Sequence, residues 1–415
     1  MADMEMNVPD GWEHRKLGDV FVSRNDKSNQ IKSSDYLDSG VYPVVDQSEV
    51  FVCGYSDDAN KVISTNLPFV VFGDHTRHTK FIDFPFVCGA DGTQLVKPKG
   101  EFDNQFFYYL VLKASQLIGN HGYDRHFKHL KNFPAVFPKS AAEQRQIAHI
   151  LSKVDEAISQ TEQLIAKYRR LKTGLMQDLL TKGIDAHGNI RSEETHAFKD
   201  SPLGRIPAEW EVVSAGSLCH EIVVGIVVRP TQYYIESGVP MLRSQNVRPR
   251  GIIMRDLVYM SPYNNDKLAK SKLQEGDVVS VRTGYPGTTA VVSKSVAGSN
   301  CIDLVISRVN KSVLDPHFLA LWINSEYGKK QILNHQSGIA QQHFNVGQMK
   351  NLGIFKLEVS EQQRILKHLS AFEDNALNLS QELLKLQSLK TGLMQDLLSG
   401  KVRVGQFIPE TLEVC

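Results

Sequence analysis

The chain contains 415 residues, of which 22% are charged and 41% hydrophobic, and its formal net charge is +1. These values are typical of a soluble globular protein with two or three domains. The near-zero charge excludes a broadly basic surface, so any nucleic-acid site must be a local patch. The five cysteines show no CxxC spacing, and no apolar stretch approaches the roughly 20 residues of a spanning helix. We expect a cytoplasmic protein without disulfides, a zinc site or a membrane segment.

The first part of the chain, residues 1–139, is expected to form a mixed α/β domain. It contains short β-rich runs bounded by Gly, Pro and Asp, such as "LPFVVFG", and a helical pattern at residues 103–119. Residues 140–181 are expected to form one long helix, because they contain no Pro and a single Gly. The polar residues 182–209 then read as a linker.

The same order of elements follows in the second part of the chain. Residues 210–357 are expected to form a second mixed domain, with two strands joined by a Gly/Pro-rich turn at 276–292 and a helix at 316–333. Residues 358–400 are expected to form a second long helix, and 401–415 a C-terminal tail.

The two halves share a repeated frame. "LKTGLMQDLL" occurs at residues 171–180 and again, 218 positions later, at 389–398. At the same offset "EQRQIAHILSKVDE" matches "EQQRILKHLSAFED", and Pro-x-x-Trp-Glu occurs near the start of both halves at an offset of 198. Between these matches the offset drifts to about 209, which indicates different insertions. The chain is therefore a tandem duplication, in which the repeated segments are more similar in sequence than the regions between them.

Both predicted long helices carry a heptad pattern of apolar residues, which is typical of coiled coils. The seam is expected to include Leu151, Val154, Ile158, Leu369, Phe372, Leu379 and Leu386. Lys172 and Lys390 fall on the seam at equivalent positions, and a polar seam residue tends to fix the register. Pairing of the two helices is the simplest arrangement. The alternative is that each helix packs separately in its own half.

No sequence motif of a catalytic or cofactor site is convincing. The chain lacks GxxxxGK[ST], GxGxxG after a strand, and HExxH. His126 and His129 have no evident third metal ligand nearby. "NLPF" at residues 66–69 departs from the Asn-Pro-Pro-Tyr/Phe motif of amino-methyltransferases at Leu67, and "GDHTRHTK" at 73–80 lacks a second acid with nuclease spacing. We expect a chain that is not an enzyme.

Five loops carry side chains suited to DNA, because Arg pairs with guanine, Asn or Gln pairs with adenine, and Lys and Thr hold phosphates. The candidates in the first half are His75, Arg77, His78, Lys80, Tyr123, Arg125, His126 and Lys128. Those in the second half are Arg243, Gln245, Asn246, Arg248, Arg250, Arg282, Thr283, Tyr285, Gln341, Gln342, His343 and Asn345. Each residue alone fits an ordinary solvated turn. Their occurrence in corresponding parts of two duplicated halves favours DNA binding.

The repeated order of Pro-x-x-Trp, a variable region, His-Phe, Glu-Gln, a long helix and "LKTGLMQDLL" resembles the specificity subunit of a type I restriction–modification enzyme. The resemblance covers essentially the whole chain, and "SPLGRIPAEWEVV" at 201–213 and "RTGYPG" at 282–287 strengthen it. It implies an α+β fold with two tandem mixed α/β target-recognition domains, each followed by a long helix. The helices would pair as an antiparallel coiled coil with pseudo-twofold symmetry.

The resemblance also implies a function. Each domain would read half of a bipartite, asymmetric sequence in double-stranded DNA, and the helices would form a spacer and a docking surface for two modification (methyltransferase) subunits. Those partners would carry S-adenosylmethionine and methylate adenine, and restriction subunits, two where present, would carry ATP and Mg. This chain would be non-catalytic and hold no cofactor. The alternatives are the recognition portion of a fused restriction–modification enzyme and a coiled-coil scaffold without base specificity.

Overall fold

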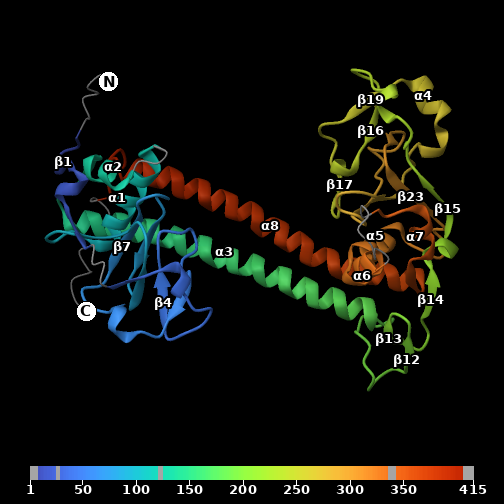
Figure 1. Ribbon diagram of the computed structural model, residues 1–415, viewed down its shortest axis with the longest axis horizontal. Helices are drawn as coiled ribbons and strands as arrows, with labels where there is room; N and C mark the ends of the chain where they lie inside the picture. Colours follow the sequence, from blue (N-terminus) through green and yellow to red (C-terminus); the bar gives the residue numbers. More distant parts are fainter. Residues whose placement is uncertain (1–7, 25–28, 120–124, 335–342, 405–415) are drawn as a thin grey trace. The chain divides into compact units, whose positions relative to one another are not determined.

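The computed structural model describes residues 8–24, 29–119, 125–334 and 343–404. The chain divides into two compact units, of which unit 1 joins Met1–Leu164 with Leu379–Cys415 and unit 2 is Ile165–Asn378 (Figure 1). The division passes through both long helices, α3 (Ala141–Thr181) and α8 (Val359–Leu397). Each unit therefore contains one globular domain and a part of each helix.

The domain of unit 1 is built on a four-stranded antiparallel sheet in the order β2-β10-β7-β8. Its strands are β2 (Phe21–Arg24), β7 (Phe69–Gly73), β8 (Thr79–Ile82) and β10 (Thr93–Pro98). Side chains alternate along β7, so that Val70 and Phe72 pack with the buried face of α1 (Asn104–Leu117), while Val71 faces a second sheet. The first helix begins where Asp103 caps two backbone amides.

The second sheet of unit 1 has the order β3-β9-β4-β5, with β6 beside β9. Its strands are β3 (Gln30–Ile31), β4 (Tyr42–Val45), β5 (Gly54–Ser56), β6 (Val62–Ile63) and β9 (Phe86–Gly89). A separate pair, β1 (Trp12–Lys16) and β11 (Pro134–Pro138), joins the start of the domain to its end, and α2 (Phe127–Asn132) precedes β11. The first residue of this pair, Trp12, belongs to the same buried core as α1.

The domain of unit 2 repeats this topology although the two sequences differ. Its main sheet has the order β15-β23-β20-β21, and β14 pairs with β24 as β1 pairs with β11. The common elements are β14 (Glu211–Ser214), β15 (Cys219–Val224), β16 (Val239–Leu242), β19 (Val258–Met260), β20 (Val278–Val281), β21 (Thr289–Val291), β22 (Asn300–Cys301), β23 (Leu304–Val309), α5 (Pro316–Asn324), α7 (Val346–Asn351) and β24 (Gly353–Lys356). The elements without a counterpart among the described residues of unit 1 are β17 (Val247–Arg248), β18 (Gly251–Ile252), α4 (Pro262–Lys267) and α6 (Glu326–Asn334).

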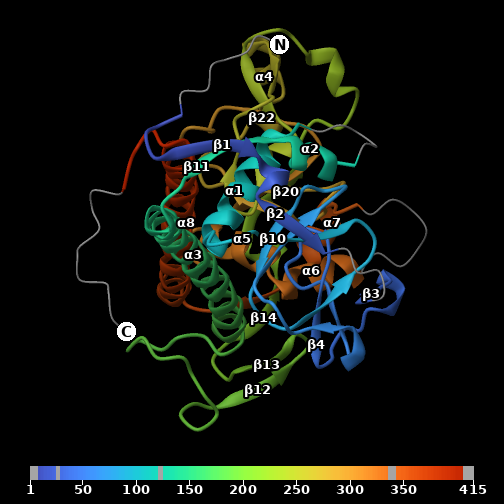
Figure 2. The same ribbon diagram turned by 90° about the vertical axis from the view of Figure 1, so that its left-hand side faces the viewer.

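In each unit a segment of α3 packs against a segment of α8 that runs in the opposite direction (Figures 1 and 2). In unit 1, Leu151 shares a core with Leu397, and Lys390 Nζ lies 2.6 Å from Asp155 Oδ1. In unit 2, Lys172 pairs with Glu373, four residues after Leu369, which belongs to the core of that unit. The predicted seam residues are buried or half-buried, namely Leu151, Val154, Ile158, Leu369, Phe372, Leu379 and Leu386.

These two ion pairs occupy the same place in the repeat. Asp155 and Glu373 are 218 positions apart, as are Lys172 and Lys390. The two seam lysines therefore each face an acidic residue of the other helix, rather than lying unpaired among apolar side chains. A polar pair of this kind favours one register of the two helices over others.

Each long helix begins at a cluster of Trp, Glu and Arg side chains, which we call an anchor cluster. In unit 1, Trp12 Nε1 donates to Glu143 Oε1 at 3.4 Å, and Arg403 Nη2 donates to Glu143 Oε2 at 3.0 Å. The glutamate thus joins the start of the domain to the segment that follows the other long helix. Its neighbour Gln144 accepts a hydrogen bond from Asp103 N at 2.9 Å, which ties the helix to the first turn of α1.

The anchor cluster of unit 2 is made of Trp210, Glu361 and Arg191. Trp210 Nε1 lies 3.3 Å from Glu361 Oε2, and Arg191 Nη2 lies 3.2 Å from the same oxygen. The following residue, Gln362, accepts from Asp315 N at 2.8 Å, at the start of α5. The repeated Glu-Gln dipeptide of the sequence is therefore the joint between each domain and its long helix.

The predicted linker is not entirely irregular. Residues 182–209 contain the hairpin of β12 (Phe198–Ser201) and β13 (Gly204–Pro207), and they supply Arg191 to the anchor cluster. The prediction of a loop was wrong for the hairpin, because its few apolar residues give no alternating pattern. Within the described part of the chain, no helix is long and apolar enough to cross a membrane.

Candidate nucleic-acid interface

Four segments of the unit 1 domain meet at one end of its main sheet. We call residues 46–53, 73–78, 90–92 and 125–126 the first loop cluster. The buried Asp74 joins three of them, since its amide donates to Gly92 O at 2.8 Å and its carbonyl accepts from His126 N at 2.9 Å. Its carboxylate accepts from Phe127 N at 2.8 Å, and the same side chain lies 4.0 Å from Arg125 Nε. The arrangement fixes the loops relative to the sheet of this domain.

The predicted DNA-contacting residues of the first half are divided between surface and interior. His75, His78, Arg125 and Lys128 are exposed, whereas Lys80 and His126 are buried. The half-buried Arg77 adopts a left-handed backbone conformation, with φ 64°, and its Nη1 lies 3.4 Å from Ile118 O. The remaining candidate, Tyr123, lies outside the described residues.

The buried candidates support the loops from beneath. Lys80 Nζ donates to the carbonyl of Asp46 at 2.9 Å and to those of Val50 and Phe51. Burial lowers the pKa of this ammonium group. His126 Nδ1 lies 2.9 Å from Asp74 O. Both side chains are directed into the domain, so their contribution is to hold the loops in place.

The unit 2 domain has a second loop cluster at the equivalent end of its sheet, formed by residues 243–257, 282–287, 302–303 and 343–345. Phe344 N donates to Arg282 O at 2.9 Å, and the Arg282 guanidinium pairs with the carboxylate of Asp303. Thr283 Oγ1 donates to the other oxygen of that carboxylate at 3.2 Å. The β17–β18 hairpin packs on the sheet through Val247, which shares a core with Val281.

The second loop cluster also combines exposed and supporting side chains. Gln245, Arg248, Arg250, Tyr285 and His343 are exposed, and Arg243, Arg282 and Thr283 are half-buried. Asn246 is buried and donates to Ile253 O and Arg255 O at 3.0 and 2.8 Å, which closes the 243–257 loop. Asn345 caps α7 by accepting from Gln348 N at 2.9 Å. Gln341 and Gln342 lie outside the described residues.

The exposed part of the second loop cluster is rich in groups that recognise DNA. Tyr285, at the tip of the β20–β21 hairpin, is 83% exposed, more than any other large hydrophobic side chain of the described residues. Gly284 and Gly287 on either side of it have φ of 83° and 81°, which lets the hairpin turn tightly at this point. Arg248 and Arg250 lie on the neighbouring hairpin.

Some supporting residues were not predicted from the sequence. In the second loop cluster, Asp303 pairs with Arg282 at the base of the β20–β21 hairpin. In the first loop cluster, Gln47 donates to Asp91 O at 2.6 Å and accepts from His75 N at 3.1 Å, which links their two segments. Asp303 has a positive φ of 51°, but neither residue lies in a sequence pattern that distinguishes it from an ordinary loop residue.

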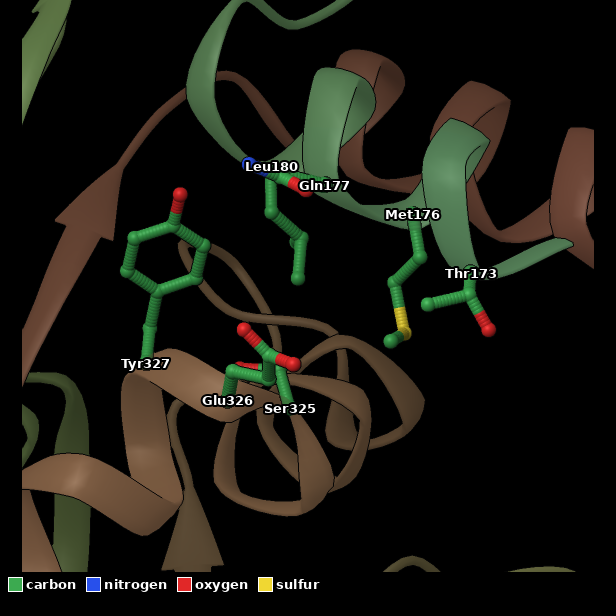
Figure 3. A pocket seen from close by; sticks show the side chains of 7 residues that line it. All are labelled: Thr173, Met176, Gln177, Leu180, Ser325, Glu326 and Tyr327. Atoms are coloured by element: carbon green, nitrogen blue, oxygen red, sulfur yellow. The ribbon is translucent and has the colours of Figure 1, made fainter. Parts of the chain in front are cut away.

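The described residues include a pocket of about 290 Å³ in unit 1, lined by charged side chains such as Glu13, Arg15 and Lys99. No group of three or more His, Cys, Asp or Glu among the described residues is placed to hold a metal ion. Another pocket, of about 30 Å³, lies between α3 and α6, where Met176 and Leu180 point toward Ser325 and Glu326 (Figure 3). This volume is far below the roughly 300 Å³ of a small ligand site. The repeated segment therefore uses this face for packing within unit 2.

Comparison with known proteins places this architecture in a family. The family model for the type I restriction modification DNA specificity domain matches residues 9–168 and again 207–387. The MjaVIII specificity subunit of a type I restriction enzyme from Methanocaldococcus jannaschii is 25% identical over 421 residues, covering 96% of this chain and 95% of that protein. A putative MjaX specificity subunit from the same organism is 28% identical over 431 residues, with the same coverage of both chains.

Solved structures share the fold. The S subunit of a type I restriction–modification system from M. genitalium superposes with a TM-score of 0.59 at 14% identity, covering 96% of this chain and 98% of that one. A second chain, from a study of type I complex assembly, gives a TM-score of 0.57 at 19% identity, covering 95% and 100%. The double family match, one in each half, agrees with the repeated topology described above. The chain belongs to the family of type I restriction–modification specificity subunits.

Proposed function

We propose that this chain reads a bipartite, asymmetric DNA sequence, with one half-site recognised by each loop cluster. The observation that carries the proposal is that the two clusters lie at the same place in one repeated fold but present different side chains. A repeated fold provides two equivalent reading positions. Different side chains at those positions give two different half-sites, and hence an asymmetric target.

The chemistry of the second cluster supports base recognition in the major groove. The exposed Arg248 and Arg250 carry the planar donors that pair with guanine, and Gln245 carries the amide that pairs with adenine. The first cluster offers His75, His78 and Arg125. The buried Lys80, His126 and Asn246 serve as supports for the reading loops rather than as base contacts, which revises their assignment from the sequence.

The long helices are proposed to separate the two reading positions and to bind partner subunits. A helix of 41 residues is about 60 Å long, enough to separate half-sites by one to two turns of B-DNA. Leu171 and Leu389 occupy the same position in the repeated segment and are 47% and 50% exposed. Exposed leucines at equivalent positions fit two copies of one partner.

The partners proposed are two modification subunits, which would carry S-adenosylmethionine and methylate adenine in each half-site. Where restriction subunits join the complex, ATP and Mg would belong to them. Specificity subunits are generally non-catalytic, and the proposed role of this chain within an adenine methyltransferase or endonuclease complex is to select the sequence.

The central experiment exchanges residues 12–138 for the corresponding region of another specificity subunit and sequences the methylome of cells expressing the complex. We expect one half of the recognised sequence to change while the other half and the spacer stay the same. A change in both halves would contradict separate reading by the two domains. Unchanged recognition after combined substitution of the exposed loop residues would favour the scaffold alternative.

A second experiment tests the partners. Co-expression with the cognate modification subunit is expected to give a complex of one copy of this chain with two partners, measured by native mass spectrometry. Leu171→Asp and Leu389→Asp should each remove one partner. Full assembly of the double variant would contradict the proposed docking surface.

A third experiment tests the spacer. Insertion of one heptad into each of α3 and α8 is expected to lengthen the spacer of the methylated sequence without altering either half-site. A spacer of unchanged length would contradict the proposed role of the helices.

A further inference from the structure

The loop between β4 and β5, residues 46–53, is topologically equivalent to the loop that carries the arginines of the second domain. In the first domain β4 lies parallel to β9 and antiparallel to β5, and in the second β16 lies parallel to β22 and antiparallel to β19. The registers agree, since Pro43 faces Tyr55 and Pro240 faces Tyr259. The loop after β4 has eight residues and the loop after β16 has fifteen, so the two loops are matched by their flanking strands and not by their length.

This shorter loop is held rigidly at both ends. Lys80 lies beneath it, 4% exposed, and donates to three of its carbonyls, those of Asp46, Val50 and Phe51. Three donors of an ammonium group satisfied by one loop fix the backbone of that loop. The Phe51 ring lies 6.0 Å from that of Phe84, which adds a packing contact at the far end.

The loop is also joined to the hairpin that carries the exposed histidines. Gln47 accepts from His75 N at 3.1 Å, donates to Asp91 O at 2.6 Å, and its carbonyl accepts from Thr76 Oγ1. Residues 46–51 and 75–78 therefore belong to one surface. If the hairpin approaches DNA, the loop approaches it as well.

Two neighbouring side chains of this loop, those of Glu49 and Val50, are exposed, whereas Asp46 takes part in internal contacts. Asp46 is engaged by Ser48, whose amide lies 2.8 Å from its Oδ1, and by the Tyr36 hydroxyl at 3.2 Å. Glu49 is exposed, and its carboxylate makes no hydrogen bond or ion pair with the described residues. Val50 beside it is 61% exposed. A carboxylate does not bind phosphates, but it can accept a hydrogen bond from a base edge in the major groove.

We propose that Glu49 is a specificity-determining residue of the first domain, whose carboxylate accepts a hydrogen bond from the N4 amino group of a cytosine in the major groove. Glutamate is among the side chains suited to this group, because cytosine presents a donor there and no acceptor. Val50 lies next to it, suited to contact with a neighbouring apolar base edge. The inference rests on the proposed reading of DNA by the loop clusters and adds the residue and the base.

The test is the methylome of complexes that contain Glu49→Ala or Glu49→Gln. Each variant is expected to lose the requirement for one cytosine in the half-site that changes when residues 12–138 are exchanged. The rate of methylation of the original target should fall about tenfold, the effect of one lost base contact. Thermal unfolding of both variants should match that of the unsubstituted chain, because the side chain is exposed.

The matched control is Glu101→Gln, an exposed glutamate that follows the opposite end of β10 from the first loop cluster. Its complex should methylate the original target at the original rate. If the Glu49 variants also methylate the original target at the original rate, as the control and the unsubstituted chain do, the inference is overturned and the proposed function stands. Relaxation in the other half-site, or at a base pair without cytosine, also overturns it. If the unsubstituted complex methylates no bipartite target, the proposed function fails and the inference with it.

Discussion

The two anchor clusters contain the same three residue types but differ in how far they are buried. In unit 2 the side chains of Arg191 and Glu361 are 8% and 5% exposed. In unit 1 the Glu143 side chain is also 5% exposed, but that of Arg403 is 39% exposed. The anchor cluster therefore contains a buried ion pair in unit 2 and a partly exposed ion pair in unit 1. The difference predicts that equivalent substitutions have unequal costs, and the loop clusters extend the contrast, since they share positions but not side chains.

The largest effect on stability is expected from Glu361→Ala, which removes the buried carboxylate paired with Arg191 and leaves only the exposed Glu209, whose Oε1 lies 2.9 Å from Arg191 Nε. We expect a loss on the order of 3–5 kcal/mol in the free energy of unfolding of unit 2. The equivalent Glu143→Ala should cost about 1–3 kcal/mol, because water can solvate Arg403. Urea unfolding followed by the fluorescence of Trp12 and Trp210 measures both.

The control for this pair is Glu382→Ala, on an exposed face of α8, which should change the free energy of unfolding by no more than about 0.5 kcal/mol. Equal losses for Glu361→Ala and Glu143→Ala would contradict the role assigned to burial.

The next effect concerns the supports of the two loop clusters. Asn246→Ala should lower the free energy of unfolding by about 1–3 kcal/mol, because the carbonyls of Ile253 and Arg255 lose their donor. Lys80→Met in the first domain should cost a similar amount. The neighbouring Gln245→Ala, at an exposed position, should leave stability unchanged and weaken DNA recognition. If the Asn246→Ala and Gln245→Ala variants have the same melting temperature, the supporting role assigned to Asn246 is contradicted.

A smaller effect is expected at the ion pairs between the long helices. Lys172→Glu places two acids together and should cost about 1 kcal/mol, since the pair is partly exposed. Glu373→Lys in the same chain should restore most of that loss, and a double-mutant cycle by thermal unfolding measures the coupling. The same exchange at Asp155 and Lys390 should give a similar coupling in unit 1. A coupling near zero in either unit would show that the pair does not favour the register.

The smallest effect on the folded state is expected from Tyr285→Ala, which should change the free energy of unfolding by less than about 0.5 kcal/mol. The affinity of the assembled complex for its duplex target should nevertheless fall about tenfold, since the ring is a large exposed aromatic group at the tip of a supported hairpin. Fluorescence anisotropy with a labelled duplex measures the affinity. Unchanged binding would remove this hairpin from the proposed interface.

The frame of the molecule was predictable from the sequence, and the reason is physical. The absence of Pro and the heptad spacing leave a long helix as the one regular structure available to residues 140–181, and α3 spans Ala141–Thr181. The second helix, predicted over 358–400, spans Val359–Leu397. The repeat also predicted equivalent roles for Lys172 and Lys390, although their acidic partners were identified only in the folded chain.

The candidate interface was less predictable, because residue type does not reveal the direction of a loop side chain. Lys80 and Arg125 look alike as basic loop residues, yet the first is buried against carbonyls and the second is exposed. Glu49 was not selected at all, since an acid does not match the expectation of a basic DNA surface. Its position became apparent from strand registers, which depend on contacts between residues far apart in the sequence.

The composition of unit 1 has a consequence for how the protein is made. Its domain comes from the beginning of the chain, but its anchor cluster needs Arg403 and its helix pairing needs Leu379 and later residues. On the ribosome, the α3 segment of unit 1 therefore cannot pair with α8 until the residues from Leu379 onward have emerged. Unit 2 is continuous in sequence and is completed earlier. The half that is translated first is thus the half that reaches its final packing last, the reverse of the usual order for successive domains.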